Sequence, residues 1–246
     1  MAIGTLNPTL LDVAQRVKGD GHLDKIVEMM NQTNEILTDM TMLEGNLQTG
    51  NMTTIRTGLP KATWRLFNSG VNQDKSKTAQ ITDACGMLEA YAVVDRKLVD
   101  ISNNAAEFRL QEDRAFLESM NQEMASTLFY GSKAEPEKFI GLSPRYNDKT
   151  ARSAENLIDA GGTGNQLTSI WLCVWGPNTM YGFFPKGGKA GFNIDPDGVV
   201  DALDSDGRKY KAYQTHYSWD LGLTVRDWRY AVRIANIDVS KLTKDA

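Results

Sequence analysis

The sequence is poor in the residues that most catalytic and metal chemistry requires. Its 246 residues include only 2 cysteines and 2 histidines. Cys85 and Cys173 lie far apart and no His cluster follows either, so we expect two reduced core thiols and neither a disulfide framework nor a zinc site. His22 and His216 are the only candidates for His-based catalysis, and each stands alone. We therefore expect no metal and no cofactor.

The sequence also lacks long apolar runs and an excess of positive charge. No run approaches the roughly 20 apolar residues of a membrane span, and the start has no basic region followed by an apolar core, as a secretory signal would. The net charge of -4 argues against broad wrapping of nucleic acid. With 41% hydrophobic residues, the chain can bury a sizeable core. The composition indicates a soluble, intracellular folded protein.

The strongest positive signal is a long helix predicted over residues 104–131. Asn104 can cap it, with Glu107 as the reciprocal partner three positions later, and Gly131 supplies the stop. Apolar side chains recur at helical spacing. They are Leu110, Phe116, Leu117, Met120, Met124 and Leu128. At about 1.5 Å per residue the helix would be roughly 40 Å long, and we interpret it as a backbone helix across which a sheet packs.

Two segments before this helix bury little apolar surface on their own. Residues 1–48 carry short apolar stripes, which indicate helical pieces that either pack on the main domain or dock on a neighbouring chain as an arm. From residue 50 to 83 the chain is rich in Thr, β-branched and aromatic residues between turn residues, which favours extended limbs. Because a two-stranded ribbon is marginal in isolation, these limbs either lie on the protein's own surface or project onto another subunit.

Beyond a loop predicted at 148–166, the pattern becomes that of strands. Residues 170–176 form a continuous apolar run, typical of a strand buried on both faces. Other strands are predicted over 86–95, 180–185, 209–219 and 221–237, with a turn-rich stretch at 195–207. A helix followed by an antiparallel-looking sheet is the order of an α+β fold.

No set of residues forms a catalytic constellation. The glycine-rich stretches at 161–164 and 186–189 lack the spacing of a phosphate loop. The five aspartates between residues 195 and 206 lack the Glu that closes an EF-hand, and Asp-Gly turns in an exposed loop explain them better than a calcium site. Glu112 and Asp113 are adjacent on the predicted helix and so point in different directions. We expect no enzyme activity.

The order of these segments, together with several short strings, resembles the major capsid proteins of tailed bacteriophages with the Hong Kong 97-like fold. The strings are similar to those of the podovirus-type branch of that family. They are GLSPRY at 141–146, VWGPNT at 174–179, FPKG at 184–187, DWRY at 227–230 and RIAN at 233–236. Each string alone is a weak signal, but their order and spacing over nearly the whole chain are specific.

The resemblance implies an N-terminal arm at 1–48, an extended loop (E-loop) at 49–84, and a peripheral domain at 85–246 with the spine helix 104–131 and the sheet. Family members usually continue past residue 246 into an axial domain. The resemblance therefore implies either a segment of a longer chain, which we favour, or a protein of unusual minimal form. The implied function is self-assembly, as pentamers and hexamers in the host cytoplasm, into the icosahedral shell of a virion. The shell encloses double-stranded DNA without sequence-specific binding; a portal and a decoration or scaffolding protein are possible partners.

By this resemblance we expect the loop of one copy to lie over the spine helix of its neighbour, with basic and aromatic loop residues against acidic helix residues. The candidates are Arg56, Lys61, Trp64, Arg65 and Phe67 on the loop, and Glu112, Asp113, Glu118 and Glu123 on the helix. The alternative is an encapsulin-like compartment shell, which has the same fold but encloses an enzyme instead of DNA. Self-crosslinking through a loop lysine (Lys61, Lys75 or Lys77) lacks an identifiable partner residue.

Overall fold

The computed structural model describes residues 34–101 and 105–242, and the chain divides into two compact units. Unit 1 comprises Met1–Thr38, Met87–Ser126 and Gly191–Asp220, and unit 2 comprises Asp39–Gly86, Thr127–Ala190 and Leu221–Ala246. The predicted cap at Asn104 and the helical pieces predicted before residue 34 lie outside the described residues. No helix in the described part of the chain is long and apolar enough to cross a membrane.

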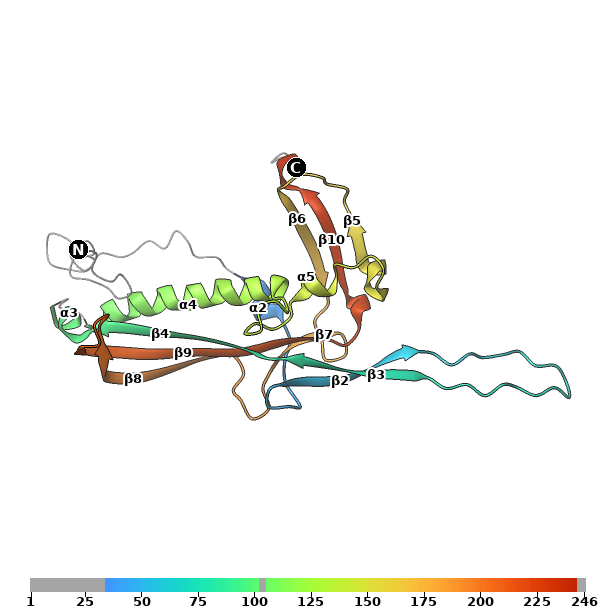
Figure 1. Cartoon of the computed structure of the whole chain (residues 1–246), viewed down its shortest axis with the longest axis horizontal. Helices are drawn as coiled ribbons and strands as arrows, with labels where there is room; N and C mark the ends of the chain where they lie inside the picture. The colour runs from blue at the N-terminus through green and yellow to red at the C-terminus, as the bar shows by residue number, and fades with distance from the viewer. Residues whose placement is uncertain (1–33, 102–104, 243–246) are drawn as a thin grey trace. The chain divides into compact units, whose positions relative to one another are not determined.

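Helices and strands alternate irregularly along the chain (Figure 1). The helices are α2 Glu35–Asp39, α3 Arg96–Ile101, α4 Ala105–Tyr130 and α5 Leu142–Arg145, with the short 3-10 helices η1 Arg152–Asn156, η2 Trp228–Tyr230 and η3 Val239–Lys241. The strands are β1 Met42–Glu44, β2 Gly50–Gly58, β3 Lys77–Ala84, β4 Gly86–Asp95, β5 Leu157–Asp159, β6 Leu167–Cys173, β7 Met180–Phe184, β8 Phe192–Leu203, β9 Lys209–Val225 and β10 Ala231–Asp238. The predicted mixture of helix and sheet is confirmed.

Unit 1 packs helix α4 against a sheet. Strands β8 and β9 form a long antiparallel hairpin, from Phe192 opposite Trp219 to Leu203 opposite Lys209, and β4 also pairs with β9. The core between helix and sheet contains Ala92 of β4, Met120 of α4 and Tyr217 of β9, all nearly inaccessible to solvent. The expected packing of a sheet on the long helix is therefore present within unit 1.

The long helix is confirmed as α4, but one end of its predicted apolar stripe is wrong. Met120, Met124 and Leu128 are buried as predicted, whereas Leu110 is 51% exposed. Phe108, absent from the predicted stripe, is fully buried. Side chains two positions apart in a helix point about 200° apart around its axis. Leu110 therefore faces away from the sheet because Phe108 faces it.

Unit 2 contains the sheets β2-β3 and β5-β10-β6, together with β1, β7 and the last residues of β9, which belong to the five-stranded sheet. Two parallel pairs occur among these strands. Strand β7 is antiparallel to the last residues of β9, while the short strand β1 is parallel to β7. In the sheet β5-β10-β6, β10 is antiparallel to β6 and parallel to β5. The main pairings are thus antiparallel, as expected, and the parallel ones come from three-residue edge strands that the sequence analysis did not predict.

Three local predictions are wrong. Strand β6 is not buried on both faces, because Ile170 and Leu172 are 51% and 58% exposed and only the face with Trp171 packs, on Tyr146. The stretch 195–207 is mostly strand β8, with a bulge at Pro196–Gly198 that absorbs the turn residues. The loop at 148–166 contains η1 and β5. The last two errors arise because strand pairing outweighs local turn propensity.

Candidate assembly interface

Strands β2 and β3 form a two-stranded ribbon that belongs to unit 2. Its register runs from Gly50 opposite Ala84 to Gly58 opposite Lys77, with an irregularity after Arg56. We call residues 50–55 and 79–84 the ribbon base and residues 59–76 the ribbon tip. The strands confirm extended limbs at the two ends of the predicted stretch 50–83, whereas residues 61–68 within it form no strand.

The ribbon base is fastened by a buried amide. Asn51, only 4% exposed, donates through Nδ2 to the hydroxyl of Tyr181 at 2.9 Å and to Oγ1 of Thr224 at 3.1 Å. These partners lie on β7 and β9, so one side chain ties the ribbon to the neighbouring sheet. A buried polar group without such partners would destabilise the fold.

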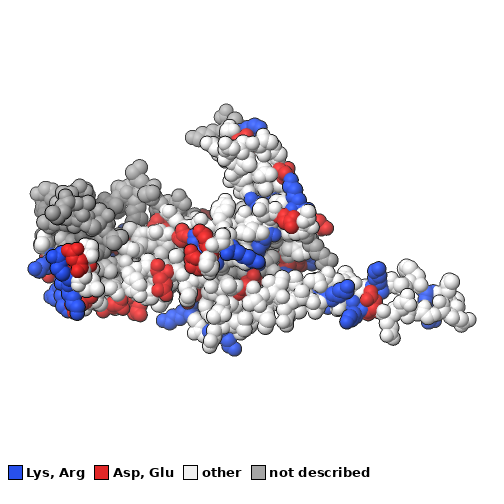
Figure 2. Space-filling model, viewed as in Figure 1, with Lys and Arg blue, Asp and Glu red and all other residues white. Residues whose placement is uncertain are grey.

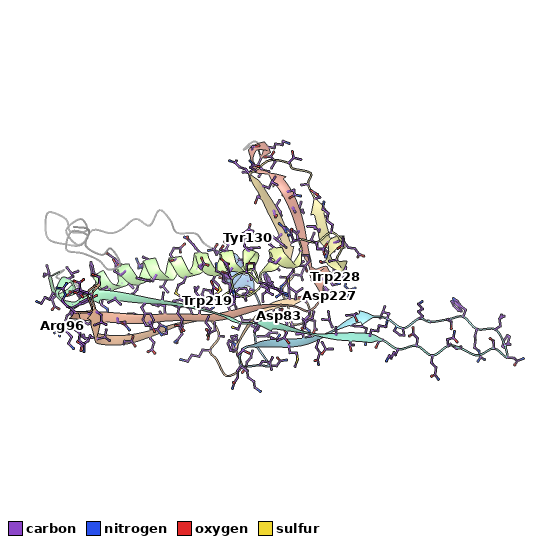
Figure 3. The ribbon with its side chains drawn as sticks, viewed as in Figure 1. Asp83, Arg96, Tyr130, Trp219, Asp227 and Trp228 are labelled. Carbon is purple, nitrogen blue, oxygen red and sulfur yellow. The ribbon has the colours of Figure 1, made fainter. Side chains whose placement is uncertain are left out.

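A buried ion pair fastens the other strand of the base. Nη2 of Arg145, on α5, lies 2.8 Å from Oδ1 of Asp83, whose side chain is 5% exposed. The same nitrogen donates to the backbone oxygens of Leu223, at 3.0 Å, and Ile140, at 3.2 Å. Asp83 is labelled in Figure 3, near the end of β3 that is farthest from the ribbon tip. The guanidinium therefore joins three segments of unit 2 at the root of the ribbon.

The ribbon tip, in contrast to the buried polar side chains of the base, exposes apolar side chains to solvent. Every residue from 59 to 76 is exposed, and the exposed side chains include large apolar ones. These are Leu59, Trp64, Leu66, Phe67 and Val71, with Trp64 and Phe67 at 104% and 96% exposure. Scattered exposed apolar residues need no explanation, but a group of five on one loop indicates a contact surface.

Local hydrogen bonds give the tip a defined shape. The amide of Ser69 donates to the oxygen of Leu66 at 3.2 Å, and Asn68, at the turn position that needs positive φ, has φ of 60°. Farther down the tip, the Asp74 carboxylate accepts from the amides of Lys61 and Lys75, both at 2.8 Å. Both hydrogen bonds hold the pKa of Asp74 below its usual range. The bond from Lys61 also joins the two limbs, whereas the bond from Lys75 is local to one limb.

The ribbon is basic along its length. Residues 50–84 contain five Lys and Arg (Arg56, Lys61, Arg65, Lys75 and Lys77) against two Asp. Figure 2 shows these positive side chains in groups along the ribbon with one acidic group among them. Arg56, Lys61 and Arg65, which the sequence analysis proposed for the interface, are all exposed.

The four acidic candidates lie on α4, in unit 1, and differ in exposure. Glu123 is exposed, and Glu112, Asp113 and Glu118 are half-buried. Asp113 accepts a hydrogen bond from the buried Tyr217, so part of its carboxylate serves the core of its own unit. Glu118 accepts from Nε2 of Gln122 at 2.8 Å.

The fastening residues of the ribbon base were not predicted. Asn51, Asp83 and Arg145 lie in polar stretches of the sequence, where a side chain that will be buried looks like one that faces solvent. An apolar surface at the tip was predicted through Trp64 and Phe67, because large aromatic residues stand out in a polar loop. Among residues 34–101 and 105–242, no group of three or more His, Cys, Asp or Glu is placed to hold a metal ion.

The fold, with its ribbon, long helix and sheets, is that of shell-forming proteins of the Hong Kong 97-like class. Residues 18–246 match the model of the family described as major capsid protein GP7. The chain belongs to this family, and it is a major capsid protein of a tailed phage. Membership makes it a component of the virion that assembles with copies of itself.

Solved structures agree with this assignment. The capsid protein of bacteriophage Epsilon15 is 40% identical over 100% of this chain and 75% of its own, with a TM-score of 0.74. The capsid of the Myoviridae phage XM1, at 9% identity, has a TM-score of 0.54 over 87% of this chain and 95% of that one. The SrpI encapsulin of Synechococcus elongatus, at 10% identity, has a TM-score of 0.57 over 98% and 100%. The last two likenesses show the fold alone. No curated protein matches the chain.

Proposed function

We propose that copies of this chain tile a closed icosahedral shell around the double-stranded DNA of the phage, with the ribbon tip of one copy against helix α4 of the next. The observation that carries the proposal is the ribbon tip, with its five exposed apolar side chains. Such a surface is covered in the functional state of most soluble proteins. In this assignment residues 1–48 act as the arm, 49–84 as the extended loop and 85–246 as the peripheral domain.

The distribution of charged residues supports helix α4 as the surface that the ribbon tip of a neighbouring copy contacts. The tip carries Lys61 and Arg65 beside Trp64 and Phe67, while α4 carries five acidic residues against two arginines. Glu112, Asp113, Glu118 and Glu123 are the acidic side chains proposed to face the neighbouring tip. A single exposed pair contributes about 0–1 kcal/mol, yet a shell repeats each contact many times, so weak contacts suffice.

Enclosure of DNA and enclosure of a cargo enzyme are separable by experiment. Particles isolated from cells in which the phage replicates should contain this chain and nuclease-protected DNA, and assembly should take place in the host cytoplasm. Electron microscopy should find uniform polyhedral particles formed from pentamers and hexamers. Particles that protect a co-purified enzyme and no DNA would favour the encapsulin-like alternative. The proposed role is structural, without catalysis.

Charge exchange tests the seat of the tip. Lys61→Glu with Arg65→Glu should prevent shell formation, and Glu118→Lys with Glu123→Lys in the same chain should restore part of it. Failure of the second pair to restore any shells would argue that the tip binds elsewhere.

A further inference from the structure

A groove of about 780 Å3 lies in unit 2 between the ribbon and the segment that contains η2. Residues Ile55–Leu59 and Ile81 line it from the ribbon, and Val225–Arg229 line it from the other side, with α5 and η1 completing the wall. Four arginines line this groove and only one acidic residue, Asp227. The arginines are Arg56, Arg145, Arg226 and Arg229. The remaining lining is largely apolar, through Ile55, Leu59, Val225 and Trp228.

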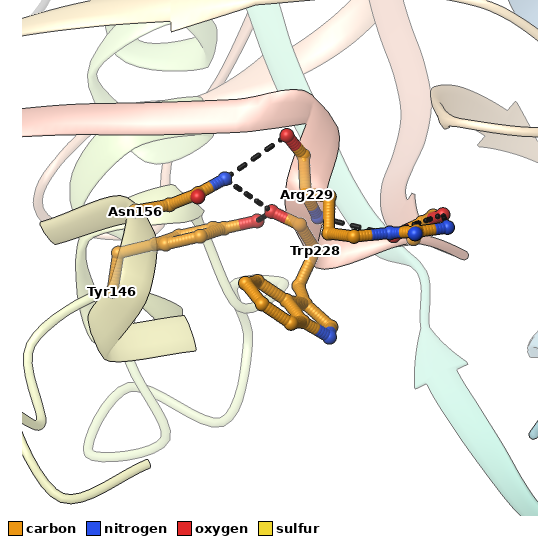
Figure 4. A network of polar contacts seen from close by, with 5 residues as sticks. Tyr146, Asn156, Trp228 and Arg229 are labelled. Carbon is orange, nitrogen blue, oxygen red and sulfur yellow. Dashed lines mark hydrogen bonds and ion pairs between the residues drawn. The ribbon is translucent and has the colours of Figure 1, made fainter. Parts of the chain in front are cut away.

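The groove wall is held in place by its own polar network (Figure 4). The hydroxyl of Tyr146 donates to the backbone oxygen of Trp228 at 2.8 Å. Nδ2 of Asn156 donates to the backbone oxygens of Trp228, Arg229 and Ala231 at 3.2, 3.0 and 2.9 Å. A wall fixed in this way loses little conformational entropy when it binds a partner.

Three of the arginines keep donors for a ligand. Arg229 binds the carboxylate of Asp227 through Nε and Nη2, and Arg226 binds the oxygens of Pro177 and Asn178 through Nη1. A guanidinium has five N–H donors, so each has donors beyond these bonds. The side chain of Arg56, unlike its backbone in the β2–β3 ladder, makes none of the hydrogen bonds or ion pairs found within the described ranges. Arg145 differs, because it is committed to Asp83 and the root of the ribbon.

The two units have opposite net charge, which indicates what the groove binds. Unit 1 contains 19 Asp and Glu against 10 Lys and Arg, a net charge of -9, whereas unit 2 contains 12 against 17, a net charge of +5. In a shell built of identical copies, these opposite charges attract when unit 2 of one copy contacts unit 1 of the next. Heterologous contacts of this kind form rings when the rotation from one copy to the next closes.

The β8–β9 hairpin of unit 1 has the chemistry that complements the groove. Residues 195–206 contain five Asp and no Lys or Arg. Within the hairpin Lys211 pairs with Asp201, and Arg208 pairs with Asp204 and Asp206, so Asp195 and Asp197 are the two carboxylates for which the described residues show no ion pair. Apolar side chains lie among these acids, with Ile194, Val199 and Leu203 at 53%, 42% and 59% exposure. The hairpin thus carries both carboxylates and aliphatic side chains, and the groove carries both arginines and apolar side chains. The two surfaces therefore complement each other in charge and in apolar character.

We propose that the groove beside the ribbon base binds the β8–β9 hairpin of a second copy of this chain. Arg56 and Arg226 pair with carboxylates of Asp195 and Asp197, and the aliphatic side chains of the hairpin cover Ile55 and Trp228. The inference rests on the proposed function, because it requires a shell of copies. It differs from the sequence-based expectation in one respect, since Arg56 contacts the hairpin of the second copy instead of helix α4. A DNA backbone would satisfy the arginines but would leave the apolar lining uncovered, so a protein partner is favoured.

The test uses charge reversal on both sides of the contact in the full chain. Arg56→Glu with Arg226→Glu should reduce the yield of shells about tenfold or more, as reversal of paired interface charges does. Asp195→Lys with Asp197→Lys should do the same, and a chain that carries all four substitutions should regain shells. A mixture of the two defective chains should also regain shells if the contact joins different copies. Thermal unfolding of each purified chain verifies that it is folded, and Arg96→Glu, on the exposed surface of α3, is the matched control.

Three outcomes would overturn the proposal. The first is normal shell yield from the groove variant. The second is failure of both the four-substitution chain and the mixture to regain shells. The third is shells of normal yield that have lost DNA, which would assign the groove to nucleic acid. Absence of shells from the unsubstituted chain would instead count against the proposed function, so the two failures are distinguishable.

Discussion

The two ends of the ribbon reverse the usual distribution of polar and apolar residues. At the base, Asn51 and Asp83 are at most 5% exposed and each is bound by partners from other strands or from α5. At the tip, Trp64 and Phe67 are almost completely exposed. The hydrogen bonds of Asn51 and of Asp83 Oδ1 hold the base in place, whereas exposed aromatic side chains stabilise nothing within their own chain.

From this contrast we propose that the base serves folding and the tip serves assembly. The buried contacts of the base hold the ribbon within unit 2, and the exposed apolar tip is the surface that we propose meets another copy. Substitutions at the base should therefore change the free energy of unfolding, while substitutions at the tip should change assembly alone. The following predictions test that division, from the largest expected change in unfolding free energy to the smallest.

Arg145→Ala should destabilise the protein most, by about 3–5 kcal/mol, because it leaves the buried carboxylate of Asp83 without its cation. Chemical denaturation followed by circular dichroism measures the change. The control is Arg229→Ala, which removes the solvent-exposed partner of Asp227 and should change the free energy of unfolding far less. Equal losses for the two variants would contradict the assignment of the buried pair.

Asn51→Leu should reduce the free energy of unfolding by about 1–3 kcal/mol. The substitution keeps the approximate volume but leaves the hydroxyls of Tyr181 and Thr224 without their donor in a buried site. Thr54→Val, at an exposed position of the same strand, is the matched control and should stay within about 0.5 kcal/mol of the parent. If the two variants unfold alike, the amide does not fasten the ribbon.

Trp64→Ser combined with Phe67→Ser should leave the free energy of unfolding of the isolated chain within about 0.5 kcal/mol of its parent value, because neither side chain is buried. The same variant should yield few or no shells by negative-stain microscopy. A large loss of stability would mean that the aromatic side chains pack within the chain.

Acid should loosen the ribbon tip. Hydrogen bonds from the amides of Lys61 and Lys75 lower the pKa of Asp74. Their stabilisation is therefore complete above the unfolded-chain pKa of about 3.9 and is lost as pH falls through the lowered value in the folded state. The amide proton shifts of Lys61 and Lys75 should titrate below pH 4 by NMR, and Asp74→Asn should abolish that titration. Shifts that stay constant down to pH 2 would exclude the hydrogen bonds.

The sequence predicted the elements that depend on local pattern and missed those that depend on distant pairing. The helix α4 and strands β2, β3, β4, β7 and β9 follow from periodicity and composition. Strand β8 was missed because Pro196 and Gly198 read as a turn, whereas the bulge absorbs them only when β9 lies beside it. The exposed aromatic side chains of the tip could be predicted as a contact surface. Asn51, Asp83 and Arg145 could not, since their burial depends on segments up to 173 residues away.

Replacement of the ribbon tip alone tests the central claim most directly. Because Gly58 lies opposite Lys77, residues 59–76 can be exchanged for Asn-Gly, which closes a two-residue hairpin, while Asn51, Asp83 and Arg145 keep their contacts. We predict a chain that unfolds at the same denaturant concentration as its parent and remains unassembled in the microscope and in sedimentation. Shells of normal size from this variant would contradict the account.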